Sequence, residues 1–246
     1  MNARAMFAGA AAALSLLAVA TGIGAWSLPT EVPGGPLARI LDAGTPLFLG
    51  AGLLLAVLTV VSGAWRTGLL LALVCAGAAI APITAYRDVT RPADPAAQSD
   101  LRVLFFNAMA QNGQPGSRIA EAAIATGADI LVFAEAEPLM DARELLEAEF
   151  EFVSPCMGET CELLIATNLP VLRSWQLSLN PAWAERYAVL EVEVPDRGTL
   201  FVAAGHMAKP WMSGIAEAEL ARMTAQLNWL TGPSVVVGDF NMPPWS

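Results

Sequence analysis

The segment Pro233-Ser-Val-Val-Val-Gly-Asp-Phe-Asn241 is the most informative part of this chain. Its apolar residues form a run of the length typical of a buried strand, and polar residues follow where the run ends. Side chains two residues apart in an extended segment point the same way. We therefore expect the carboxylate of Asp239 and the carboxamide of Asn241 to address one ligand together.

Strand-like and helix-like segments mix along the whole chain after residue 100. Strands are expected at 101–107, 129–135, 162–167, 171–179, 187–194, 199–206 and 234–240, and helices at 117–127, 138–150 and 213–232. Ser213 is the expected cap of the last helix. Helices interspersed with strands, and four strands in succession, predict a layered α/β domain with partly antiparallel pairing.

The first third of the chain has the composition of a membrane region. The chain is 55% hydrophobic and only 15% charged, and the apolar excess lies at the front. Three runs without charge, each about 20 residues long, match the length needed to cross a bilayer as a helix. They predict spans at about 6–26, 46–65 and 67–86. For the first run, a cleaved signal peptide is the alternative.

The expected organisation is a transmembrane region over 1–86, a proline-containing linker over 87–100 and a folded domain over 101–246. If Arg4 and Arg66 are cytoplasmic, three crossings place the folded domain outside the cytoplasm of a bacterial inner membrane. In an oxidising compartment Cys156 and Cys161 could form a disulfide, with free thiols as the alternative.

The charge is unevenly distributed. Five Arg face four acidic residues through Ser99, whereas eight basic residues face 19 acidic ones from Asp100 onward. Such an acidic domain lacks the basic surface on which nonspecific nucleic-acid binding depends.

Polar side chains recur where the expected strands end. Asn107, Glu135 and His206 each follow an apolar run, as Asp239 and Asn241 do. Each alone has an ordinary structural explanation as a turn or hydrogen-bonded residue. Together they suit phosphoester hydrolysis, because Mg²⁺ prefers carboxylate oxygen and water, and amide or imidazole groups can stabilise an oxyanion.

The ordered set FFNAM, VFAEAE, AAGHM and VVVGDFN resembles the endonuclease/exonuclease/phosphatase superfamily, in a branch with hydrophobic spans before the catalytic domain. The resemblance covers Leu101 to the end and implies a four-layer α/β sandwich. It implies Glu135 as the metal ligand for Mg²⁺ or Mn²⁺, with Asn107 supporting the metal and the phosphate. It implies that His206 binds the scissile phosphate, that Asp239 orients the attacking water and that Asn241 supports the phosphoryl oxygens.

The chain departs from the family pattern at several positions. Ala134 stands where the family usually has Gln, and Gly205 where it has Thr. Arg186 matches an Arg that contacts phosphate in some members, although an Arg that opens a strand is commonly a solvated edge charge. Family members continue past this motif with further strands and an Asp-His pair, so we expect either a C-terminally truncated sandwich or an inactive protein.

The sequence therefore predicts a membrane-anchored, metal-dependent hydrolase of phosphodiesters or phosphomonoesters, with nuclease activity included. Expected partners are the lipid bilayer and a phosphate-ester substrate, which could be a nucleic acid, a phospholipid or a small molecule. The alternatives are an inactive membrane sensor or partner-binding protein of the same fold, and a membrane protein whose folded part is only a structural cap.

Overall fold

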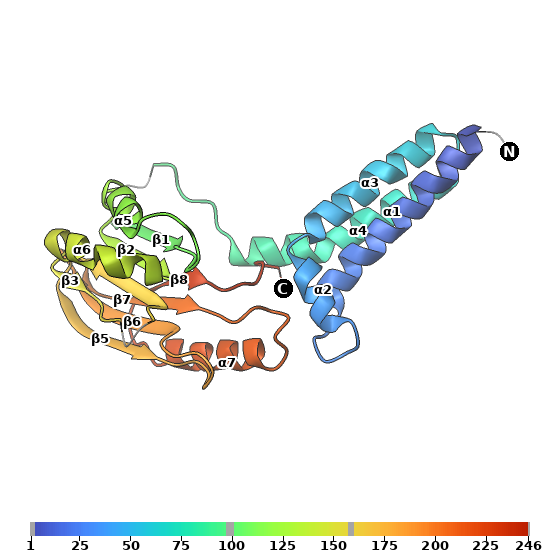
Figure 1. Cartoon of the computed structure of the whole chain (residues 1–246). Coiled ribbons are helices and arrows are strands. Elements are labelled where there is room, and N and C mark those ends of the chain that lie inside the picture. The colour runs from blue at the N-terminus through green and yellow to red at the C-terminus, as the bar shows by residue number, and fades with distance from the viewer. Residues whose placement is uncertain (1–2, 97–100, 157–159, 246) are drawn as a thin grey trace. The chain divides into compact units, whose positions relative to one another are not determined.

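A computed structural model describes residues 3–96, 101–156 and 160–245 of the chain (Figure 1). The chain forms two compact units. One runs to Pro95 and includes short segments that begin at Lys209 and Met242, and the other holds the two β-sheets. The predicted linker partly lies outside the described residues, at 97–100.

The helical unit contains α1 (Ala3–Ser27), α2 (Gly35–Asp42), α3 (Thr45–Val61) and α4 (Trp65–Val89). Among the described residues, α1 and α4 are long and apolar enough to cross a membrane. A third span requires that α2 and α3, which are bent by 81° to each other, be counted together. The core of the unit contains Val19, Leu49 and Cys75, and the Ser15 hydroxyl donates to the Gly52 carbonyl at 2.7 Å.

Several bounds in this unit differ from the prediction. The sequence pattern missed α2 altogether. The second and third expected spans leave only Arg66 for the turn between them, whereas the turn lies earlier, around Gly63, whose φ of +100° is a left-handed conformation that suits glycine. Helix α4 continues past Tyr86 to Val89 and ends shortly before Pro92, as expected for a helix that meets a proline.

The second unit contains two four-stranded sheets. The first has the order β1 (Val103–Asn107), β2 (Ile130–Ala134), β4 (Leu163–Thr167) and β3 (Phe152–Val153). The second has the order β5 (Val171–Leu177), β6 (Tyr187–Val194), β7 (Gly198–His206) and β8 (Ser234–Asp239). Pairs β1–β2 and β7–β8 are parallel, whereas β2–β4, β3–β4, β5–β6 and β6–β7 are antiparallel. The partly antiparallel pairing matches the sequence-based expectation.

Side chains of β2 alternate between the two faces of its sheet, and this alternation explains the layers of the domain. Leu131 and Phe133 pack toward α5 (Gly116–Ile124), η1 (Glu137–Ala142) and α6 (Arg143–Glu149). Ile130 and Val132 point to the other face, where they meet apolar residues of β6 and β7. Because both faces of β2 are covered, its sequence is continuously apolar. Helix α7 (Ile215–Leu227) lies along the second sheet, which completes a four-layer α/β sandwich (Figure 1).

Two local expectations need correction in this unit. The cap of α7 is Gly214 in a left-handed conformation, not Ser213. The Gly214 amide donates to the Glu217 carboxylate at 2.7 Å, which is the second half of a capping box. The expected helix over 138–150 begins as the 3₁₀ segment η1 and becomes α-helical only at Arg143, and the two-residue strand β3 was not predicted.

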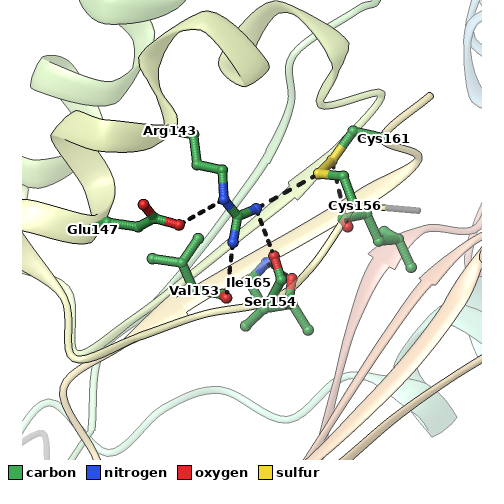
Figure 2. The surroundings of a disulfide bond; sticks show 8 residues. Arg143, Glu147, Val153, Ser154, Cys156, Cys161 and Ile165 are labelled. Atoms are coloured by element: carbon green, nitrogen blue, oxygen red, sulfur yellow. Dashed lines mark hydrogen bonds and ion pairs between the residues drawn. A yellow bond between two sulfur atoms is a disulfide. The ribbon is translucent and has the colours of Figure 1, made fainter. Parts of the chain in front are cut away.

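Cys156 and Cys161, which precede β4 in the sequence, are joined by a disulfide (Figure 2). Figure 2 shows Arg143 between this bond and Glu147, with its guanidinium donating to the carbonyl oxygens of Val153 and Ser154 at 3.2 and 2.9 Å. A cross-link that closes so short a loop stabilises the folded state by about 2 kcal/mol. It fixes the chain immediately before Glu162.

Candidate active site

Sheet topology brings the predicted polar residues to one end of the sandwich. Parallel pairing sets Asn107 beside Ala134, the residue before Glu135, and sets His206 beside Asp239. The two sheets pack face to face through β2, β4, β6 and β7. The carboxyl ends of β1, β2, β7 and β8 therefore meet at the same end of the sandwich.

The centre of the site is the side-chain amide of Asn107. Its Nδ2 donates to Glu135 Oε1 at 3.0 Å and to Asp239 Oδ2 at 2.9 Å, so one nitrogen joins carboxylates from both sheets. Its Oδ1 accepts the Met109 amide at 2.8 Å, which fixes the orientation of the carboxamide. The carboxylates of Glu135 and Asp239 therefore face a common point rather than opposite sides.

Glu135 is held in an uncommon backbone conformation. Its φ is +49°, in the left-handed region, and its amide donates to the Glu162 carbonyl at 2.9 Å. Oε2 accepts the Ala110 amide at 3.2 Å. The side chain is 26% exposed, so this carboxylate is positioned by the backbone around it and still reaches solvent.

The imidazole of His206 lies between two carboxylates. Nδ1 is 3.0 Å from Glu162 Oε2, and Nε2 is 3.6 Å from Glu135 Oε1. The ring is almost fully buried, with 3% of the side chain exposed. Glu162 thus fixes the ring so that Nε2 faces the centre of the site.

Glu162 was not among the sequence-predicted residues. Glu162 precedes β4, which runs antiparallel to β2 with Leu163 opposite Ala134. The start of β4 therefore lies at the same end of the sandwich as the carboxyl end of β2. The strand-end pattern considered only the carboxyl ends of strands, and Arg186, at the start of a strand, was predicted from the family resemblance alone. A sequence signal existed, because ELLIAT begins with a Glu and follows β2 as a separate strand.

Arg186 reaches the site in the same way, at the start of a strand antiparallel to β7. Its guanidinium donates to Glu162 Oε1 at 3.1 Å and stacks on the Trp183 ring, 4.7 Å from the centroid. Its side chain is only 13% exposed. Among the described residues, its buried Nε has no hydrogen-bond partner.

Asn241 differs from the expected geometry. Strand β8 ends at Asp239, and Asn241 has a φ of +53°, so the alternation rule for extended chains does not apply to this pair. Its amide donates to Asp239 Oδ1 at 3.0 Å, and its Nδ2 donates to the Met207 carbonyl at 2.7 Å. In these contacts Asn241 orients Asp239 and ties β8 to the end of β7.

The pKa of Glu162 lies below its usual value. Burial raises this pKa, but the hydrogen bond with His206 and the positive charge of Arg186 outweigh it. A carboxyl whose folded-state pKa is depressed stabilises the fold above its unfolded pKa of about 4.3. That contribution is lost as the pH falls through the lower folded-state pKa.

We expect the stability difference between the wild-type chain and Glu162→Gln to shrink as the pH is lowered from 7 to 3. Thermal unfolding across this range measures it. Glu121→Gln, an exposed carboxylate on α5, is the control and should give no such trend. A gap that stays constant down to pH 3 would contradict the assignment of Glu162 as an ionised partner.

No family model and no curated protein matches this sequence. Solved structures do. TDP2 from Caenorhabditis elegans matches with a TM-score of 0.50 and 14% identity, over 90% of this chain and 66% of that one. An endonuclease/exonuclease/phosphatase from Beutenbergia cavernae matches with a TM-score of 0.44 and 22% identity, over 57% and 47%. This chain has the endonuclease/exonuclease/phosphatase fold.

The resemblance found in the sequence is thereby confirmed at the level of fold. A further match is TDP2 from D. rerio, solved with a single-strand DNA product, with a TM-score of 0.48 and 12% identity over 58% of this chain and 61% of that one. The chain spans about half the length of the Beutenbergia cavernae protein.

Proposed function

We propose that this protein is a membrane-anchored, divalent-metal-dependent phosphoesterase. The observation that supports it best is the Asn107 amide, which joins Glu135 and Asp239 at 3.0 and 2.9 Å at the end of the sandwich. His206 adds an imidazole 3.6 Å from the same Glu135 oxygen. Carboxylates, a carboxamide and an imidazole around one point are the groups that hydrolysis of a phosphoester needs.

The donor set fits Mg²⁺ or Mn²⁺. Within the described ranges, no three His, Cys, Asp or Glu side chains are grouped so that they could hold an ion. Mg²⁺ is nevertheless commonly bound by one or two carboxylates, with water and substrate phosphate as its other ligands. Glu135 would hold the ion, and Asn107 would keep this carboxylate in place through its Nδ2. When bound, the ion would neutralise charge that develops on the phosphoryl oxygens.

The remaining residues have separate roles. Asp239, whose Oδ2 accepts from Asn107, would orient the attacking water and accept its proton. His206 would donate from Nε2 to a phosphoryl oxygen, while Glu162 holds the ring at Nδ1. Asn241 and Arg186 would keep Asp239 and Glu162 in place for these steps.

The substrate class is narrowed by charge and by the membrane helices. The 19 acidic residues after Ser99 disfavour tight binding of duplex nucleic acid. The span-length apolar helices favour a phospholipid or a small phosphoester near the bilayer.

The direct test is hydrolysis by the full chain in detergent. Bis-p-nitrophenyl phosphate represents diesters and p-nitrophenyl phosphate represents monoesters. We expect p-nitrophenolate release that needs Mg²⁺ or Mn²⁺ and stops with EDTA. His206→Ala should lose this activity, whereas the exposed Glu144→Gln on α6 should keep it. Absence of metal-dependent release from both substrates would contradict the proposed function.

The folded domain is proposed to lie outside the cytoplasm. The disulfide between Cys156 and Cys161 supports this side, because such bonds persist in oxidising compartments. Fusions of alkaline phosphatase and of green fluorescent protein after Val89 test it in a bacterial host. Phosphatase activity without fluorescence is expected, and the reverse pattern would place the domain in the cytoplasm.

A further inference from the structure

A buried glutamate on α7 is unexplained by the site described above. The buried residues of α7 are Ala216, Glu219 and Met223, which share the face of the helix that packs on the protein. A position with this spacing normally holds an apolar residue. Glu219 is fully buried, and a buried carboxylate is costly unless its oxygens are hydrogen-bonded.

Both oxygens of Glu219 are occupied, and by different segments. Oε2 accepts the Ala208 amide at 2.6 Å, two residues after His206. Oε1 accepts the side-chain amide of Asn180, which is itself buried in the loop between β5 and β6. One carboxylate therefore connects the end of β7 with this loop.

Asn180 also binds the backbone of the loop in which it lies. Its Oδ1 accepts the amides of Ala182 and Trp183 at 2.7 and 2.9 Å. Because these two donors require the carboxamide oxygen, Nδ2 must face the carboxylate of Glu219. One turn further along α7, Arg222 donates to the Leu179 carbonyl, so the same helix holds the loop at a second point.

The loop leads directly to the site. Trp183 stacks on Arg186, and Arg186 pairs with Glu162, which holds the ring of His206. The Arg186 carbonyl also accepts the His206 amide at 2.8 Å. Glu219 thus contacts both the segment that carries His206 and, through Asn180, the loop that carries Arg186, the cation that pairs with Glu162.

We propose that Glu219 and Asn180 form a positioning clamp that holds the 178–186 loop, and through it Arg186 and Glu162, against His206. Neither residue touches the reacting groups. The clamp's contribution to hydrolysis rests on the function proposed above, but its effect on His206 does not depend on any activity.

Two readouts test the clamp in the full chain. His206 is the only histidine, so selective ¹⁵N labelling gives the imidazole signals of one ring. We expect Glu219→Gln and Asn180→Ala to shift these signals in the direction that Glu162→Gln shifts them, because all three loosen the contact at Nδ1. Glu217→Gln, on the same helix, is the matched control and should leave them unchanged.

The kinetic readout is kcat/KM for bis-p-nitrophenyl phosphate, which we expect to fall on the order of 10²-fold in both variants, mainly through kcat. The double variant should lose no more than the worse single one, because the two residues act as a unit.

Folded variants that melt at lower temperature but keep the wild-type imidazole signals would reduce Glu219 to a structural residue and overturn the proposal. If the wild-type chain hydrolyses no phosphoester, the proposed function fails while the imidazole signals still decide on the clamp. If both variants fail to fold, hydrogen exchange of the unsubstituted chain decides. Slow exchange of the Trp183 and Ala208 amides supports the clamp, and fast exchange of either overturns it.

Discussion

Glu135→Gln is expected to keep its fold and to lose metal-dependent phosphoester hydrolysis by on the order of 10³-fold. A bound divalent ion supplies several kcal/mol of transition-state stabilisation, and each 1.36 kcal/mol is a factor of ten in rate. Glutamine has the volume of glutamate and can accept from Asn107, but it carries no charge for the ion. The measurements are kcat/KM with each p-nitrophenyl substrate and titration of Mg²⁺ or Mn²⁺ binding.

Glu144→Gln is the matched control, since it removes one carboxylate from the exposed surface of α6. Circular dichroism of both variants should equal that of the wild type, because Glu135 is 26% exposed and outside the core. Metal-dependent hydrolysis at the wild-type rate in Glu135→Gln would remove the metal assignment and, with it, the mechanism.

Much of the sandwich could be predicted from the sequence, because burial on both faces leaves long apolar runs. Strands β2 and β4 are examples, and the structure gives them bounds within one residue of the expected runs. Short elements whose existence depends on tertiary contacts could not be found in this way. Strand β3 has two residues, and its ladder exists only because β4 lies beside it.

The site was only partly predictable, because some of its residues depend on the direction in which two strands pair. Residues that follow a strand were recognised, and Asn107, Glu135, His206 and Asp239 do converge. Glu162 precedes its strand and meets them only because β4 is antiparallel to β2. Pairing direction is a long-range property, so the Glu that begins ELLIAT can be placed at the site only once the antiparallel pairing of β4 with β2 is known. Glu219 was hidden for a similar reason, since its partners lie 11 and 39 residues away in the sequence.

Gly238→Ala is expected to destabilise the α/β unit by about 3 kcal/mol or more and to lower hydrolysis by at least 10²-fold in any folded fraction. Gly238 pairs with Gly205 across the parallel strands β7 and β8. A Cβ at Gly238 would lie 2.0 Å from the Gly205 carbonyl oxygen and 2.9 Å from its carbonyl carbon. These are backbone atoms, which cannot move aside as a flexible side chain can. The strands must separate at the position that precedes Asp239 and His206.

Gly205→Ala provides the matched control, because it adds a methyl group to the partner glycine of the same pair. A Cβ there would meet Met223 Sδ at 3.4 Å and Phe240 Cε1 at 3.6 Å, which are ordinary contacts. We expect its thermal unfolding to stay within about 1 kcal/mol of the wild type. Equal stability of the two variants would show that β7 and β8 are not held as closely as the register requires. Asp239 would then be free to leave Asn107, and the proposed ion site between the two sheets would lose its structural basis.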